Sequence, residues 1–258
     1  MDINYVKKRF LHGESTLGVI TNIGCTQLVE IIGLTDFDYV LFDMEHGPIS
    51  EETLQNLVRT AKFVGLVPLV RVRENNPKMI LQALDLGACG VMVPQVETGQ
   101  DVRAVIDAVK YTPLGKRGLS TFTPAGRWGT IPLPQHIEHS NENTIIIAQI
   151  ETTKGVENVQ SIANVNGLDV IIVGPADLSQ SLSIPGEFRH PLLQEAIDEV
   201  IQVACRSQVT AGALVRNVEQ VKEFYGKGVR FFLTGILGLF YNAAAEQASA
   251  MKAALPPE

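Results

Sequence analysis

The chain has 258 residues, of which 45% are hydrophobic and 19% are charged. This composition is typical of a globular protein and excludes a disordered or fibrous chain. Acidic residues number 28 against 21 lysines and arginines, so the formal net charge is −7. Such a charge repels phosphate backbones and anionic membrane surfaces, which argues against nucleic acid or a membrane as a partner.

No segment of the sequence predicts a membrane span or a disulfide framework. The longest charge-free run, 231–245, is too short and too polar to cross a bilayer, and residues 1–16 contain no apolar stretch. Cys25, Cys89 and Cys205 lie far apart and form no C-x-x-C pair, which favours buried thiols over disulfides or a zinc site. We therefore expect a cytoplasmic protein.

Short apolar runs rich in β-branched residues alternate with segments of helical periodicity along the chain. The eight runs cover residues 18–23, 39–45, 67–72, 90–96, 144–151, 168–174, 211–215 and 229–237. Helix boundaries are indicated by Ser50 before two glutamates, by Pro191, and by Gly226 and Gly228. Nearly continuous apolar strands predict a parallel sheet that is covered on both faces.

Eight strand-and-helix units in about 250 residues predict a single closed (β/α)8 barrel, a TIM barrel, over residues 1–258. An open doubly wound sheet is the alternative, but no glycine-rich phosphate loop follows the first run. Residues 111–143 are rich in proline and glycine, and we expect them to form a long loop. We expect this loop to lie over the barrel mouth; the alternative is a solvated insertion or a subunit contact.

Catalytic residues of such barrels lie at the carboxyl ends of the strands, and ionisable residues gather at four of these positions. Glu151 and Asp177 follow neighbouring strands, so their carboxylates can converge on one point while water fills the remaining positions. This arrangement suits a hard divalent cation, magnesium or manganese first, with cobalt also compatible. An isolated carboxylate at a strand end can equally cap a helix or form a salt bridge.

Strand alternation places Gln149 on the same side as Glu151, and Arg71 on the same side as Arg73. We expect Arg71 to lie deeper and Arg73 to lie at the rim, paired with a surface carboxylate. The fixed charge and rigid donors of a guanidinium suit a carboxylate or an enolate oxygen.

The same alternation places Asp43 and Glu45 on one face and His46 on the other, so a usable histidine requires a bend before Gly47. An imidazole titrates near neutrality, and an adjacent carboxylate would orient it as a general base or a water-activating group. The role of Glu45 is left open.

The order of these residues closely resembles the HpcH/HpaI family of metal-dependent class II pyruvate aldolases. The resemblance covers nearly the whole chain, and its combined motifs are highly specific. The matching segments are FDMEHGP (42–48), LVRV (69–72), ALDLGACGVMVPQVET (83–98), GKRG (115–118), RW (127–128), QIET (149–152) and GPADLS (174–179).

The resemblance implies a role for each site residue. Glu151 and Asp177 would bind the metal, Arg71 would hold the keto or enolate oxygen, and Asp43 with His46 would form the acid/base pair. The pyruvate unit would be bound by Gln149 and by the backbone amides of Ala176 and Asp177. The resemblance further implies a homohexamer whose subunits exchange their last helix, with Asp85 near a neighbour's site.

These implications favour an aldolase, a carbon-carbon lyase that splits a 4-hydroxy-2-oxo acid into pyruvate and an aldehyde. The segment 72–76 departs from several aldolases after the arginine, which leaves the aldehyde open. One alternative is a citrate-synthase-like condensation of acetyl-CoA with oxaloacetate, which requires room for CoA near the long loop. Another is an oxo-acid-binding protein without turnover, which has no need of a base.

Overall fold

The computed structural model describes residues 5–255, in which eight parallel strands close into a barrel in chain order. The strands are β1 Thr16–Thr21, β2 Tyr39–Asp43, β3 Val67–Arg71, β4 Gly90–Val93, β5 Ile145–Ile150, β6 Val170–Val173, β7 Thr210–Leu214 and β8 Phe231–Gly235. The last strand pairs with the first, Thr16 opposite Phe231, so the sheet has no open edge. The predicted (β/α)8 barrel is confirmed.

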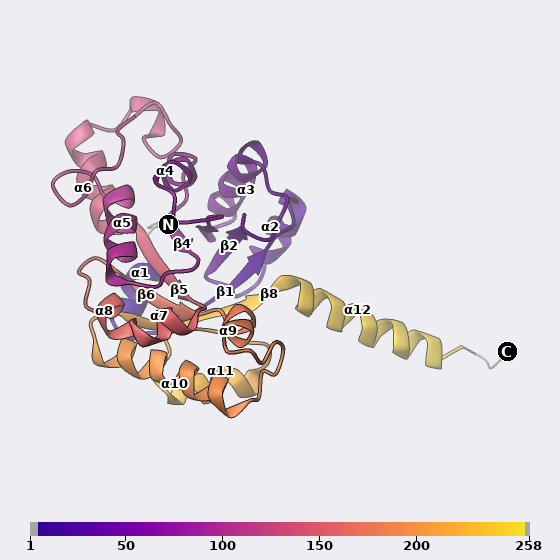
Figure 1. Ribbon diagram of the computed structural model, residues 1–258. Coiled ribbons are helices and arrows are strands. Elements are labelled where there is room, and N and C mark those ends of the chain that lie inside the picture. The colour runs from indigo at the N-terminus through magenta and orange to yellow at the C-terminus, as the bar shows by residue number, and fades with distance from the viewer. Residues whose placement is uncertain (1–4, 256–258) are drawn as a thin grey trace.

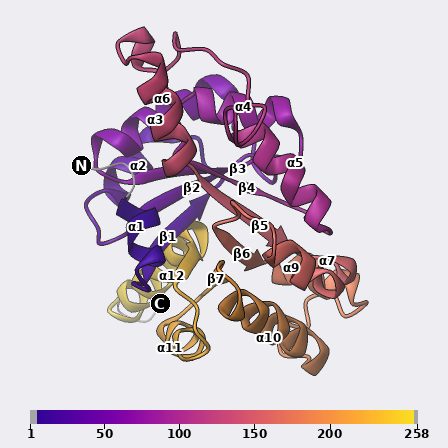
Figure 2. The same ribbon diagram turned by 90° about the vertical axis from the view of Figure 1, so that its left-hand side faces the viewer.

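The helices other than the last one pack around the barrel (Figures 1 and 2). Three of them begin or end where the sequence indicated, at Ser50, Pro191 and Gly226. The helices are α1 Tyr5–Leu11, α2 Thr26–Ile32, α3 Glu51–Phe63, α4 Pro77–Asp85, α5 Gly99–Val109, α6 Leu133–Asn143, α7 Thr153–Glu157, α8 Val159–Ala163, α9 Pro175–Ser181, α10 Pro191–Arg206, α11 Val218–Gly226 and α12 Ile236–Ala253, with a 3-10 turn at Arg127–Gly129. Ser50 caps α3 by accepting a hydrogen bond from the Thr53 amide, and Pro191 is the first residue of α10.

The inside of the barrel is a packed core at its amino end. Tyr39 stacks on Phe231 with 4.5 Å between ring centroids, and Phe10 of α1 meets Phe231 edge-on at 6.2 Å. Gly18 leaves room for this stack, because a Cβ at that position would lie 2.3 Å from the Tyr39 ring. With the amino end filled, the carboxyl ends of the strands are left to form a site.

The segment 111–143 lies at the amino end of the barrel, because it connects the end of α5 to the start of β5. It is irregular only up to residue 132, since its last third forms α6. Arg117 and the Ala125 amide both bond to Asp85 at the end of α4. The expectation that this segment covers the barrel mouth is wrong, because both of its anchors lie at the opposite end.

The last helix, α12, projects away from the body of the molecule (Figure 1). None of its residues is buried, and Phe240 and Tyr241 are each 71% exposed. No helix among residues 5–255 is long and apolar enough to span a membrane. The prediction of buried thiols holds for Cys89 alone, since Cys25 is half-buried and Cys205 is exposed.

Candidate active site

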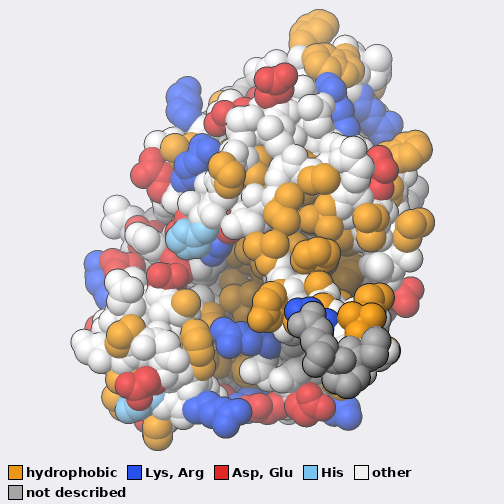
Figure 3. All heavy atoms as spheres, turned by 90° about the vertical axis from the view of Figure 1, so that its right-hand side faces the viewer, with side chains coloured by type: hydrophobic (Ala, Val, Ile, Leu, Met, Phe, Trp, Pro, Cys, Tyr) orange, Lys and Arg blue, Asp and Glu red, His pale blue; other side chains and the backbone are white. Residues whose placement is uncertain are grey.

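A cavity of about 510 Å³ opens at the carboxyl ends of the strands. Its volume falls within the range of small-molecule sites. Figure 3 views the molecule from the side toward which α12 projects and shows hydrophobic side chains across the middle of this face, with charged side chains around them. At the end near β2 to β6, the cavity is lined by His46, Arg71, Gln149, Gly174, Pro175, Ala176 and Asp177.

Asp43, the last residue of β2, organises the turn that follows it. Its Oδ1 accepts the backbone N–H of Glu45 at 3.0 Å and that of His46 at 3.3 Å. A Cβ at Gly47 would lie 2.7 Å from the Asp43 carbonyl oxygen, so the chain packs closely here. These bonds form the bend that the sequence required, and they bring His46 to the cavity wall.

Arg71 ends β3 beside Asp43, and the two side chains form a bidentate pair. Arg71 Nε donates to Asp43 Oδ1 at 2.9 Å, and Nη2 donates to Oδ2 at 2.7 Å. Burial raises the pKa of Asp43, but the Arg71 bonds and the two backbone N–H groups outweigh it and lower the pKa overall. Asp43 is therefore ionised and holds the guanidinium in one orientation.

The prediction that Arg71 lies deeper than Arg73 is confirmed. The Arg71 side chain is 11% exposed, whereas that of Arg73 is 41% exposed. Arg73 contacts Glu51 at 3.6 Å and donates to the Ile49 carbonyl, as expected of a rim residue.

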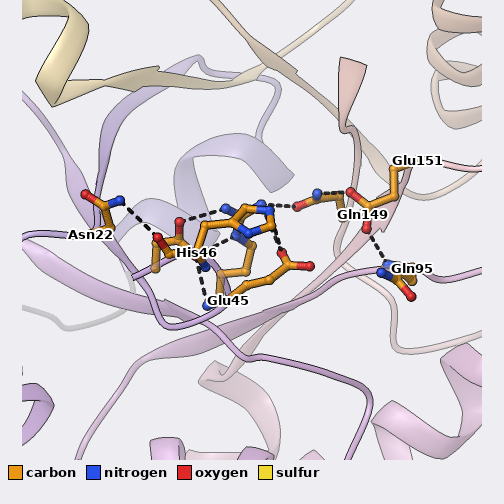
Figure 4. Close-up of polar contacts among 8 residues, drawn as sticks. Asn22, Glu45, His46, Gln95, Gln149 and Glu151 are labelled. Atoms are coloured by element: carbon orange, nitrogen blue, oxygen red, sulfur yellow. Dashed lines mark hydrogen bonds and ion pairs between the residues drawn. The ribbon is translucent and has the colours of Figure 1, made fainter. Parts of the chain in front are cut away.

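Glu45, whose role the sequence left open, lies beside the His46 ring (Figure 4) and within ion-pair distance of both His46 and Arg71. Its Oε2 is 3.2 Å from Arg71 Nη1 and 3.9 Å from His46 Nε2. Among the described residues, Glu45 supplies the carboxylate within ion-pair distance of the His46 ring, and Asp43 contacts only the His46 backbone. The same Oε2 atom is buried without a hydrogen bond, so it can accept one from a protonated His46 ring.

Gln149 and Glu151 extend from the end of β5 on the same side, as strand alternation predicted. The Gln149 amide donates to Glu151 Oε2, and its Oε1 accepts from Arg71 Nη1 at 3.4 Å (Figure 4). Glu151 Oε1 accepts the backbone N–H of Gln95 at 2.8 Å. Gly174 leaves room for this carboxylate, since a Cβ there would lie 2.6 Å from Glu151 Oε2.

The charges around the cavity do not balance. Burial, together with the charges of Glu45 and Asp177, raises the pKa of Glu151. Burial likewise raises the pKa of Glu45. The charges of three carboxylates (those of Asp43, Glu45 and Glu151) act on the one guanidinium of Arg71, and a fourth carboxylate, Asp177, acts on Glu45 and Glu151. A bound cation would offset this excess of negative charge.

The donor set fits a hard divalent cation, because Asp177 and Ala176 line the cavity and the charge of Asp177 acts on the Glu151 carboxylate. Glu151 itself is 2% exposed and is not among the residues that line the cavity. No group of three or more His, Cys, Asp or Glu side chains within residues 5–255 has the geometry of a complete metal cluster. Two protein carboxylates leave the other positions to water and substrate, as is common for Mg²⁺.

Three contributors to the site were not singled out from the sequence. Gln95 supplies a backbone N–H, and its φ of 54° after Pro94 places it in an unusual conformation. Gly174 supplies space, and Asn22 Nδ2 donates to the His46 carbonyl at 3.1 Å. Asn22 stands at a strand end, and Gln95 and Gly174 lie in the matching segments 83–98 and 174–179. The roles of Gln95 and Gly174 could not be predicted, because one acts through its backbone N–H and the other through its lack of a side chain.

Fold and site together define an enzyme-type (β/α)8 barrel with ionisable side chains gathered at the carboxyl ends of its strands. The chain belongs to the HpcH/HpaI aldolase/citrate lyase family, whose model matches residues 23–243. It is 30% identical to 2-keto-3-deoxy-L-rhamnonate aldolase of Klebsiella pneumoniae, over 96% of this chain and 92% of the relative.

Solved structures of the family agree with this assignment. An HpcH/HpaI aldolase from Desulfitobacterium hafniense has 30% identity and a TM-score of 0.89, with 97% of each chain covered. The citrate synthase SbnG has 32% identity and a TM-score of 0.87, with 96% of this chain and 97% of that chain covered. The chain is thus similar to proteins named for two different carbon-carbon bond reactions.

Proposed function

We propose that this protein is a metal-dependent aldolase that reversibly cleaves a 4-hydroxy-2-oxo acid into pyruvate and an aldehyde. The observation that carries the proposal is the excess of carboxylates around Arg71 at the barrel mouth. The resemblance to proteins named as aldolases over nearly the whole chain supports it.

A divalent cation, magnesium or manganese, would be held by Glu151 and Asp177 and would withdraw electrons from the oxo acid. Arg71 binds the keto oxygen and stabilises the negative charge that develops on it as the bond breaks. Asp43 fixes the guanidinium through two bonds, so little reorganisation is needed during the reaction. The Gln149 side chain and the backbone amides of Ala176 and Asp177 bind the rest of the pyruvate unit.

His46 accepts the proton of the 4-hydroxyl group during cleavage and returns it in the reverse direction. Its side chain is 58% exposed and lines the cavity, so substrate or an intervening water can reach the ring. Glu45, 3.9 Å from Nε2, stabilises the protonated ring. The acid/base pair that the resemblance assigned to Asp43 and His46 is thus better described as His46 with Glu45, with Asp43 as a positioning residue.

The test measures exchange of the pyruvate methyl protons in deuterated water and turnover of pyruvate with a panel of aldehydes, with and without Mn²⁺. We expect Arg71→Ala and Glu151→Gln to lose at least 99% of both activities, the loss typical of removing one such electrostatic contact. Circular dichroism checks that both variants are folded. Wild-type turnover in either variant would refute the site assignment.

A citrate-synthase-like activity is the second candidate, because SbnG is 32% identical and has the same fold. The structure removes one argument for it, since the segment 111–143, where room for CoA was expected, lies at the opposite end of the barrel. Thiol release from acetyl-CoA with oxaloacetate, without pyruvate proton exchange, would decide in favour of this candidate.

The exposed α12 supports a further part of the proposal, an assembly in which this helix packs on another subunit. A helix with apolar residues such as Leu237, Phe240 and Tyr241 in contact with water gains stability by being covered. A homohexamer with exchanged last helices is the arrangement that the family resemblance implies. The mass in solution, measured by light scattering, tests it.

A further inference from the structure

The cavity extends beyond the catalytic residues toward α10, α11 and the start of α12. The lining of this second half includes Phe188, Gln194, Arg216, Gln220, Glu223 and Asn242. Its walls are mainly apolar and amide side chains, with two charged residues, Arg216 and Glu223. The reaction leaves this half free for the part of the substrate that departs as the aldehyde.

Arg216 lies across the barrel mouth from Arg71. It follows β7 by two residues, whereas Arg71 ends β3, and these strands lie on opposite sides of a closed eight-stranded barrel. Both residues line the same cavity. A substrate whose oxo-acid end contacts Arg71 therefore extends its other end toward Arg216.

The guanidinium of Arg216 is oriented but not neutralised. It stacks on the Phe188 ring with 4.5 Å from Cζ to the ring centroid, and the Arg216 backbone N–H donates to Gln220. Within the described part of the chain, no carboxylate lies within ion-pair distance of it. The other charged residue of this half, Glu223, is paired with Lys227 at 2.8 Å.

We propose that Arg216 is a specificity-determining residue that binds an anionic group, carboxylate or phosphate, on the aldehyde substrate. The stacking on Phe188 holds the planar donor fork in place, which suits bidentate binding of either group. A neutral aldehyde gains nothing from this contact. The inference rests on the proposed aldolase activity and narrows its second substrate to a charged class.

The test uses two matched pairs of aldehydes with pyruvate and Mn²⁺: 4-oxobutanoate with pentanal, and glyceraldehyde 3-phosphate with glyceraldehyde. We expect the wild-type enzyme to favour the charged member of one pair, which also distinguishes carboxylate from phosphate. In Arg216→Met the ratio of kcat/KM for the charged over the neutral member should fall by about 10- to 100-fold, the range of a charge-assisted hydrogen bond. Arg216→Lys should restore part of this ratio.

Arg206→Met is the matched control, because Arg206 is an exposed arginine at the end of α10 that does not line the cavity. It should leave the ratio as in the wild type. The role of Arg216 is overturned if the wild-type enzyme exchanges pyruvate protons but prefers the charged aldehyde in neither pair. This holds whether the two members of a pair react equally or neither member reacts. Absence of pyruvate exchange in the wild-type enzyme refutes the aldolase proposal itself.

Discussion

The Asp43–Arg71 pair is the interaction on which the shape of the site most depends, and Asp43→Asn tests it. The substitution places an amide or a neutral oxygen against both guanidinium nitrogens, which now lie 2.9 and 2.7 Å from a carboxylate. Removing one partner of a buried pair costs about 3–5 kcal/mol. Glu45 remains 3.2 Å from Arg71 Nη1 and still offsets part of the arginine's charge. We therefore expect Asp43→Asn to lower the free energy of unfolding by roughly 2–4 kcal/mol.

For a chain of this length, that loss lowers the Tm by roughly 5–15 °C. Thermal unfolding is followed by circular dichroism at pH 7 without metal, with Asp36→Asn as the control at an exposed aspartate before β2. We also expect pyruvate proton exchange to fall at least 100-fold, because Arg71 loses its fixed orientation. A variant that unfolds within 1 °C of the wild type and exchanges pyruvate normally would refute this account of Asp43.

Four further outcomes are expected. The bonds from Arg71 lower the pKa of Asp43, so this carboxylate stabilises the folded state at neutral pH. That stabilisation is lost as the pH falls through the lowered folded-state pKa. The free energy of unfolding should therefore fall more steeply with acid in the wild type than in Asp43→Asn. Mn²⁺ at about 100 times its Kd should stabilise the wild type by about 2.7 kcal/mol, measured by thermal shift. The control variant Glu52→Gln should gain the same, and Glu151→Gln less than a third of it. Gly174→Ala should remain folded, since its φ of −91° suits alanine, yet bind Mn²⁺ at least 10-fold more weakly by calorimetry because the methyl group displaces Glu151. Phe240→Asp should lower the mass found by light scattering, and an unchanged mass would show that α12 makes no subunit contact.

The fold could be predicted because its signals are local. Each buried strand is a short run of apolar residues, and eight such runs leave few alternatives to a barrel. Strand alternation predicted the shared side of Gln149 and Glu151. It also placed Arg71 and Arg73 on one side, and Arg71, which comes earlier in the strand, was expected to lie deeper. These predictions needed only the periodicity of an extended chain.

Other features depend on contacts between distant residues and could not be predicted in this way. Glu45 and His46 lie beyond the end of β2, where the turn organised by Asp43 breaks the alternation. The position of the segment 111–143 depends on its bonds to Asp85, far away in the sequence. Arg216 follows a strand whose end carries no other charged residue, so only the cavity relates it to the site.

The central claim is that Glu151 and Asp177 together bind the divalent cation that withdraws electrons from the oxo acid. A crystal structure with Mn²⁺ and pyruvate tests it most directly through the anomalous signal of manganese. We predict a single strong peak within bonding distance of one oxygen of each carboxylate, with the pyruvate keto oxygen facing Arg71. A peak elsewhere in the cavity, or pyruvate bound at Arg71 with no manganese between the two carboxylates, would contradict the account.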